Sequence, residues 1–262
     1  SGAGTDVSGG GVRLNMVPRD GGNKLSGSIF GGYQDKSFQS DNLTQDLIDR
    51  GLKTPDGIEK LWNLEGAVGG PIKKDKAWFF GSARAFHLGT LPADALVGIP
   101  GTAGPNHAPT PSGEAGIDKQ SINSFQARIV WQVSQKTKLS GYNDRLLKNR
   151  GSAMVAGFDP ATASQPWNSP IYTTGAVKVT STLTNKVLFE AGVSTNYERY
   201  NIIMQPGIQQ PRGTDAWAFN VNKNDTALGT QWNAAQYTNG QYPDRFTVTG
   251  SMSYVTGTHN IK

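Results

Sequence analysis

Apolar and polar residues alternate along most of the chain, in runs separated by turns and loops. The clearest run sets apolar against polar side chains on the two faces of one segment: Phe125, Ala127, Ile129, Trp131 and Val133 against Ser124, Gln126, Arg128 and Gln132. A period of two is typical of a β-strand whose faces meet different surroundings. The pattern predicts eight long strands, over residues 25–33, 62–72, 77–87, 124–133, 138–149, 171–183, 187–198 and 246–254.

Short and long connections alternate between these strands. Three are short and polar, at 73–76, 134–137 and 184–185, and the others are long, at 34–61, 88–120, 150–169 and 205–243. Short periplasmic turns and long extracellular loops are the usual arrangement in outer-membrane β-barrels. We therefore predict that the Lys73–Lys76 turn faces the periplasm and that the 88–120 loop lies at the opposite end of the strands.

The first long loop carries the pattern of a short helix over residues 43–50. Asp41 or Asn42 is expected to cap its start, and Gly51 to end it in a left-handed conformation.

Composition favours a membrane β-barrel over a soluble domain of the same size. Only 36% of the 262 residues are hydrophobic, and the mean hydropathy is −0.46. A barrel tolerates these values because only half of each strand faces lipid. The sequence contains no run of 18 apolar residues, the length that a transmembrane helix requires. Aromatic residues near the strand ends suit interfacial girdles: Tyr33, Trp62, Phe86, Trp131, Tyr197 and Tyr254.

The remaining features exclude several classes of function. The absence of cysteine excludes a disulfide scaffold and a cysteine-ligated metal, and the net charge of +5 is too scattered to indicate a nucleic-acid surface. His87, His107 and His259 have no zinc-binding spacing, and there is no Gly-x-Ser-x-Gly elbow. We expect no enzymatic activity, no cofactor and no bound metal.

Three parts of the chain resemble a known family. The run from Gly10 to Asn23, with Gly-Gly-Val, an alternating strand, a basic residue and Gly-Asn, resembles the last plug strand of TonB-dependent outer-membrane receptors and its exit. The run from Leu64 to Ser82 resembles their second and third barrel strands. Residues 40–44 and 50–55 resemble the first extracellular loop of the Oar-like subgroup, which carries an N-terminal carboxypeptidase-regulatory-like domain.

The resemblance implies a barrel of about 22 strands around a plug. We expect residues 1–22 to end the plug domain and 23–262 to form the N-terminal part of the barrel. The chain is then a partial one, since its start lacks a leader and its end resembles an unfinished strand. The plug-to-barrel passage is expected at Asn15, Pro18, Asp20, Gly21, Gly22 and Asn23.

As the resemblance implies, the parent protein lies in the outer membrane of a Gram-negative bacterium. It binds a solute outside the cell and imports it with energy from TonB. The expected partners are outer-membrane lipid, an unidentified solute, and the TonB complex, which would act through a segment N-terminal to this chain. No nucleic-acid partner is expected.

Two sets of side chains are candidates for solute contact. The alternation places five charged residues on the inferred lumen face: Glu65, Arg128, Lys178, Glu190 and Glu198. Four aromatic residues lie in the last long loop and could stack on a sugar or peptide: Trp217, Trp232, Tyr237 and Tyr242. Ordinary solvation of the barrel wall and ordinary loop packing explain the same residues equally well.

Two other readings of the pattern remain open at this point. A complete eight-stranded barrel, porin-like or an adhesin, needs the first strand to pair with the eighth. A soluble carbohydrate-binding β-domain also has alternating strands, although its loops are rarely long on one side only.

Overall fold

The computed structural model describes residues 19–99, 110–151, 154, 160–162, 164–227, 230–233, 239–256 and 259–261. The expected plug strand at 12–17, with Asn15, lies outside the described residues, and so does Pro18.

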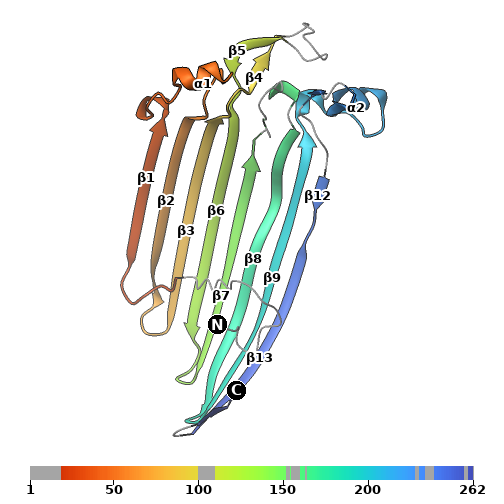
Figure 1. Cartoon of the computed structure of the whole chain (residues 1–262). Helices are drawn as coiled ribbons and strands as arrows, with labels where there is room; N and C mark the ends of the chain where they lie inside the picture. Colours follow the sequence, from red (N-terminus) through yellow and green to blue (C-terminus); the bar gives the residue numbers. More distant parts are fainter. Residues whose placement is uncertain are drawn as a thin grey trace.

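The prediction of an all-β, antiparallel fold is confirmed (Figure 1). Each predicted long strand is present: β1 (Ser26–Asp35), β2 (Gly57–Lys73), β3 (Ala77–Leu91), β6 (Asp118–Gln132), β7 (Thr137–Arg150), β8 (Ser164–Thr184), β9 (Val187–Met204) and β13 (Asp244–Thr256). The strands form one sheet in the order β1-β2-β3-β6-β7-β8-β9-β13-β14. Strands that follow one another through short turns are therefore neighbours in space.

The smaller elements lie mainly in the long connections, and α1, α2, β4 and β5 gather at one end of the sheet (Figure 1). They are η1 (Lys36–Phe38), α1 (Gln45–Asp49), β4 (Leu96–Gly98), β5 (Pro111–Ala115), η3 (Pro160–Thr162), η4 (Pro206–Ile208), α2 (Asp215–Asn220), β10 (Lys223–Asp225), β11 (Thr230–Trp232), β12 (Asn239–Gln241) and β14 (His259–Ile261). Neither helix of the described chain has the length or the apolar character needed to span a membrane.

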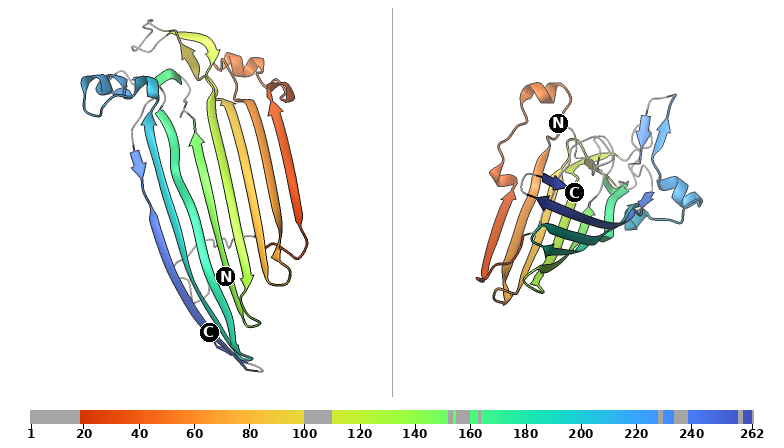
Figure 2. Two further views of the ribbon diagram at one scale, coloured as in Figure 1. Left: turned by 180° about the vertical axis from the view of Figure 1, so that it is seen from behind. Right: turned by 90° about the horizontal axis from the view of Figure 1, so that it is seen from below.

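The sheet is twisted and curved, but it is open (Figure 2). Among the described residues, β1 pairs with β2 only and β14 with β13 only, at opposite edges of the sheet. A closed barrel requires its two edge strands to pair with each other. The predicted barrel is therefore present only as a curved antiparallel sheet, and the described residues include no plug domain.

The Lys73–Lys76 turn joins β2 to β3 at the end opposite to β4 and β5 (Figure 1). The Lys76 N–H donates to the Lys73 carbonyl at 3.1 Å, and Asp75 has a φ of 59°. Aspartate tolerates this left-handed conformation better than most residues with a side chain. Antiparallel pairing thus separates the short turns from the long loops, as the alternation of connections predicts.

Helix α1 has a different start from the one predicted, but it ends as predicted. Its N-cap is Thr44, which makes no side-chain capping bond, so the predicted caps are wrong. Asp41 instead accepts a hydrogen bond from the Leu43 N–H at 2.9 Å and closes a turn ahead of the helix. The predicted end is confirmed, since Gly51 has a φ of +99° and its N–H donates to the Ile48 carbonyl.

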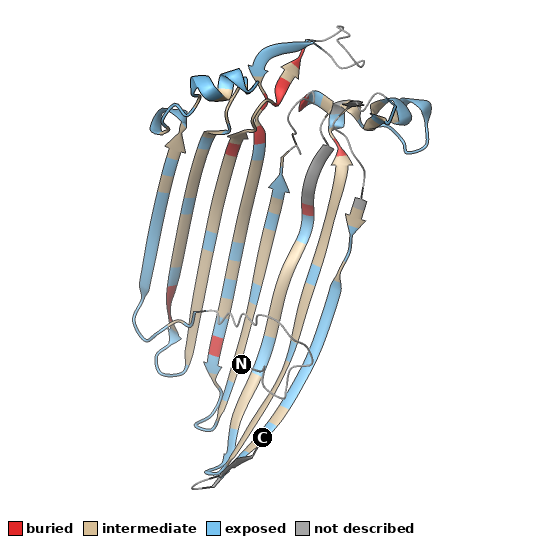
Figure 3. Cartoon of the chain, viewed as in Figure 1, coloured by how far each residue is buried: buried red, intermediate tan, exposed pale blue. Residues whose placement is uncertain are grey.

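The sheet is a single layer with very little core (Figure 3). Four apolar residues of the described chain are buried, and three of them, Ala95, Leu96 and Met204, belong to the long-loop end. The fourth is Val130 on β6, close to the short turns. Among the described residues, no second layer of secondary structure covers either face of the strands, so the side chains on both faces depend on their surroundings.

Candidate functional site

Strand pairing divides the side chains into two faces of opposite character. Residues paired across an antiparallel ladder project to the same face. The register places apolar residues from all eight long strands on one face: Ile29, Tyr33, Trp62, Leu64, Val68, Phe79, Phe125, Ile129, Trp131, Leu139, Leu147, Val177, Val179, Phe189, Val193, Tyr197, Phe246, Val248, Met252 and Tyr254. We call it the apolar face.

The apolar face is exposed along its whole width. Ile29 on β1 is 81% exposed and Val248 on β13 is 67% exposed, and exposed apolar residues occur on the strands between them. One row of the ladder crosses six strands and contains Phe79, Ile129, Gly141, Val177, Val193 and Val248. Nothing in the described chain shields this row from its surroundings.

A charged residue lies in the middle strands of the apolar face, and one aromatic residue that was predicted for a girdle lies on the other face. Arg145 of β7 projects from this face, and its guanidinium donates to the Pro170 carbonyl at 2.6 Å. Phe86 was predicted to belong to an aromatic girdle with Tyr33 and Trp62, but its register with Asn63 puts it on the other face. The prediction that Phe86 belongs to the girdle is therefore wrong. Strand β3 carries aromatic residues on both faces, so alternation alone does not assign Phe86 to one of them.

The opposite face carries most of the polar side chains of the strands, together with Phe30, Trp78, Phe80, Phe86, Val130 and Leu146, and we call it the polar face. It carries Ser26, Ser28, Asn63, Glu65, Ser82, Arg84, Ser124, Gln126, Arg128, Ser140, Asp144, Thr174, Lys178, Thr180, Glu190, Ser194, Asn196, Glu198, Arg245, Thr247, Thr249 and Ser251. All five charged residues named from the sequence lie on this polar face. Whether it lines a solute pathway stays a prediction.

Most of these charged residues form an ion pair with a residue on the neighbouring strand. Glu65 pairs with Arg84 of β3 at 3.0 Å, and Lys178 of β8 pairs with Glu190 of β9 at 2.5 Å. Arg84 also donates to Asn63 at 3.0 Å, which in turn donates to Glu65 at 2.8 Å. Cross-strand ion pairs of this exposure contribute little stability, so their main effect is to fix side-chain positions.

Residues 19–24 run across the polar face of the sheet, against its first strands. We call these residues the crossing segment. Asn23 holds it to the Lys73–Lys76 turn: its side-chain oxygen accepts hydrogen bonds from the Asp75 N–H at 3.0 Å and from the Trp78 indole at 2.7 Å. Its amide nitrogen donates to the Asp75 carboxylate. The partner of this tight turn is thus a residue some fifty positions earlier in the chain.

The middle of the crossing segment lies directly against the sheet. A Cβ on Gly21 would come within 2.1 Å of the Phe79 carbonyl oxygen, whereas one on Gly22 would meet nothing within 4 Å. Asp20 forms an ion pair with Arg128 of β6 at 2.5 Å, and the Arg128 side chain is only 13% exposed. The predicted passage residues Asp20, Gly21 and Asn23 therefore contact the sheet, and Gly22 contacts it least.

A second set of hydrogen bonds connects two of the long loops. The Asp94 carboxylate accepts hydrogen bonds from the backbone N–H groups of Lys53 and Thr54, both at 2.8 Å, and the Asp94 N–H donates to the Thr54 hydroxyl at 3.0 Å. These bonds hold the pKa of Asp94 below its usual value of 3.8, with the Thr54 N–H as the largest cause. Sequence analysis did not single out Asp94, because no local pattern pairs it with residues forty positions away.

Replacing Asp94 by alanine is expected to loosen the loop that follows α1. The Lys53 and Thr54 N–H groups lose a charged acceptor, worth roughly 1 kcal/mol at this exposure, so their hydrogen exchange should accelerate about fivefold. Hydrogen-exchange mass spectrometry of residues 50–56 measures this. Because the folded pKa is lowered, the protection should persist above pH 3.8 and fall as the pH drops through the folded value.

Asp94→Asn is the matched control for this tie. Asparagine keeps an oxygen acceptor and tolerates the φ of 51° at this position, but it does not titrate. Its protection should exceed that of the alanine variant and should not change over the same acidic range. Equal exchange in wild type and Asp94→Ala at neutral pH would show that the carboxylate does not hold the loop.

The loop aromatic residues do not form one described cluster. Trp217 lies in α2 and is half-buried, while Tyr242 follows β12, is 60% exposed, and donates its hydroxyl to Asn201 at 2.8 Å. Trp232 belongs to β11, but its side chain and the whole of Tyr237 lie outside the described residues. A ligand role for these four residues stays a prediction.

Comparisons with known proteins add no family to this picture. No protein-family model, no curated protein and no solved structure matches the chain. The described residues also contain no group of three or more His, Asp or Glu side chains that could hold a metal ion.

Proposed function

We propose that the sheet is part of the wall of an outer-membrane β-barrel, with the apolar face toward lipid and the polar face toward the barrel interior. The observation that carries this proposal is the exposed apolar face, which extends from β1 to β13 across the neighbouring strands of one sheet. Large contiguous apolar patches are rare on soluble proteins and mark a surface that meets a partner or a membrane. A bilayer is a partner wide enough to cover every strand.

Energetics supports lipid as that partner. Burying a fully exposed Val, Ile or Phe side chain contributes about 1.5–3 kcal/mol. Partly or largely exposed side chains of these types lie on this face in β1, β2, β6, β8, β9 and β13. In a soluble β-sandwich a second sheet supplies the burial, but no second layer covers the described strands (Figure 3). Each long strand between β1 and β13 pairs with a neighbour on both sides, which satisfies its backbone groups as a bilayer core requires.

We further infer that the parent protein is a receptor of the TonB-dependent, Oar-like type. The resemblance of residues 10–23 and 64–82 supports this, and so does the crossing segment, which contacts the polar face before β1 begins. In this role the crossing segment is the passage from plug to barrel. Glu65, Arg128, Lys178, Glu190 and Glu198 line the interior, and the long loops meet an extracellular solute.

The two other readings are less well supported by the fold. A complete eight-stranded barrel needs β1 beside β13, but these strands lie toward opposite edges of the open sheet. A soluble carbohydrate-binding β-domain leaves the exposed apolar face unexplained. Neither reading accounts for the close contact between residues 19–24 and the first strands of the sheet.

The membrane assignment is tested by expressing the protein from its complete gene in a Gram-negative host. We expect it in the outer-membrane fraction, with faster gel migration before heating than after, as folded barrels show in detergent. Recovery in the soluble fraction with heat-independent migration would reject the barrel. The receptor assignment has a separate test in the gene itself, which should encode a plug upstream and further alternating strands downstream of Lys262. A stop codon directly after Lys262 would reject the receptor.

A further inference from the structure

Lysine occupies the same position in all three short turns of the sheet. Lys76, Lys136 and Lys186 each directly precede the outgoing strand of their hairpin, which is β3, β7 and β9 respectively. The backbone carbonyl of each lysine accepts a hydrogen bond from the following strand of the sheet: from the Gln132 N–H at 2.7 Å, the Thr182 N–H at 2.9 Å and the Val255 N–H at 2.8 Å. These bonds fix the three turns side by side. We call Lys76, Lys136 and Lys186 the lysine rim.

The charge of the short turns is predominantly positive. The first turn adds Lys73 and Lys74, and Asp75 is the single acidic residue within 73–76, 133–136 and 184–186. The Asp75 carboxylate already accepts a hydrogen bond from Asn23. All the lysines of these turns are exposed, and none of them takes part in an ion pair within the described residues. Their ammonium groups are therefore available to an anion.

The apolar face continues as far as these turns. Trp131 of β6 and Lys73 of β2 are both paired with Ala77 of β3, so the three residues share one row of that face. Exposed aliphatic side chains lie directly before the turns: Ile72, Val133 and Leu183. Where lipid covers the apolar face, its hydrocarbon region ends at these residues, and its headgroups lie at the level of the lysine rim.

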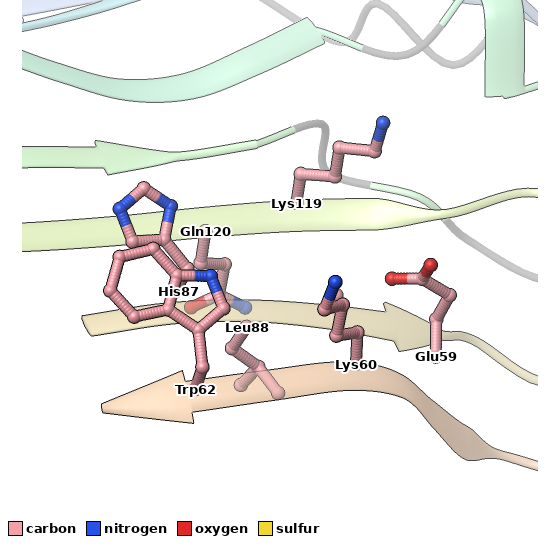
Figure 4. Close-up of a pocket in the computed structure, with 8 residues that line it drawn as sticks. Glu59, Lys60, Trp62, His87, Leu88, Lys119 and Gln120 are labelled. Atoms are coloured by element: carbon pink, nitrogen blue, oxygen red, sulfur yellow. The ribbon is translucent and has the colours of Figure 1, made fainter. Parts of the chain in front are cut away.

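The long-loop end of the same face has a different border. Trp62 and His87 stack with ring centroids 4.2 Å apart and an interplanar angle of 11° (Figure 4). Beyond this pair, Lys60 and Lys119 line one pocket together with Glu59 (Figure 4). The long-loop end therefore carries both signs of charge, whereas positive charge predominates at the short-turn end.

We propose that the lysine rim binds the phosphate groups of anionic glycerophospholipids in the leaflet that meets the short turns. In the proposed function, on which this proposal rests, that leaflet is the periplasmic one, and it consists of glycerophospholipids. Basic clusters at a membrane surface attract anionic headgroups, and a lysine ammonium reaches a phosphate on a flexible stem without a preformed cavity. Lipid is favoured over an acidic protein because the rim follows the edge of the apolar face, so whatever covers that face also reaches the lysines.

A fluorophore at position 133 reports on the lipid beside the rim. Val133 lies between two of the turns, because the Gln132 N–H bonds to Lys76 and the Val133 N–H donates to the Thr137 carbonyl, directly after Lys136. Val133→Cys places the label in the protein expressed from its complete gene, without other cysteines, and reconstituted into phosphatidylcholine vesicles. Equal amounts of nitroxide-labelled phosphatidylglycerol or phosphatidylcholine then quench the fluorescence. We expect a local enrichment of phosphatidylglycerol of about fivefold, which is lost in concentrated salt.

Two triple variants with the same change in charge separate the rim from general electrostatic attraction. Replacing the three rim lysines by glutamine should abolish the enrichment, whereas arginine at the same positions should keep it. The control combines Lys60→Gln, Lys119→Gln and Lys138→Gln, and it should bind lipid as the wild type does. Lys60 and Lys119 lie at the other end of the sheet, and Lys138 belongs to the polar face.

Equal loss of enrichment in both glutamine variants, or no enrichment in the wild type, would overturn the rim as a lipid site even if the protein inserts normally. Abolition of the enrichment by inorganic phosphate at constant ionic strength would assign the rim to free phosphate. Binding of soluble polyglutamate in place of any enrichment would assign it to an acidic protein, and either result overturns the lipid proposal. Failure of the protein to enter vesicles at all would instead contradict the membrane assignment.

Discussion

Val248→Lys should lower the free energy of unfolding of the membrane-inserted protein by about 2–4 kcal/mol. Val248 lies near the middle of β13 on the apolar face, in the row that contains Val193 and Val177. In a bilayer this position is near the midplane. A lysine there must either give up its hydration or distort the surrounding lipid to reach water. Guanidinium titration of the protein in lipid vesicles, followed by tryptophan fluorescence, measures the difference.

Thr247→Lys is a closely matched control for this substitution. It changes the adjacent residue of the same strand, which is also exposed and β-branched, but on the polar face. We expect a change within about 0.5 kcal/mol, as for most surface substitutions. If the sheet were a soluble domain, Val248→Lys would also fall within that range, because Val248 is 67% exposed in the sheet. Equal effects of the two substitutions would contradict a lipid-facing apolar face.

Gly21→Ala should release the crossing segment from the sheet. The new methyl group would overlap the Phe79 carbonyl oxygen, a backbone atom that cannot move without disturbing β3. Overpacking of this kind costs about 2 kcal/mol, which corresponds to a roughly thirtyfold rise in the population of the detached segment. Trypsin cleaves after Arg19 and Lys24, and its rate follows the detached population when opening is fast. Cleavage at these two bonds should accelerate accordingly.

Gly22→Ala separates the steric effect from the general effect of losing a glycine. No atom lies within 4 Å of the position of its new methyl group, and neither glycine has a positive φ. Its cleavage rate should match that of the wild type. If both substitutions left the rate unchanged, the close contact between the crossing segment and β3 would not exist in solution.

Much of the fold could be predicted from the sequence because strand alternation and turn residues are local signals. Phe125, Ile129 and Trp131 share a face because side chains alternate along any strand, so their placement needed no knowledge of neighbouring strands. Strand β3 was ambiguous because aromatic residues occur on both of its faces. The structure gives the reason: Trp78 lies on the polar face, where its indole donates to Asn23 of the crossing segment.

The contacts at the candidate sites could not be predicted because they join distant parts of the chain. Asn23 bonds to a turn at Asp75, Asp20 pairs with Arg128, and Asp94 ties two loops together. The arrangement of the lysine rim depends on hydrogen bonds between each short turn and the following strand of the sheet. No periodicity in the sequence encodes these bonds.

Spin labelling along β13 tests the orientation of the sheet most directly. The chain has no cysteine, so single substitutions at Thr247, Val248, Thr249, Ser251 and Met252 each place one label. In vesicles, labels at 248 and 252 should be relaxed by oxygen dissolved in the lipid, and those at 247, 249 and 251 by a water-soluble nickel complex. If the nickel complex reaches the labels at all five positions equally, the apolar face does not contact lipid and the proposed barrel wall is wrong.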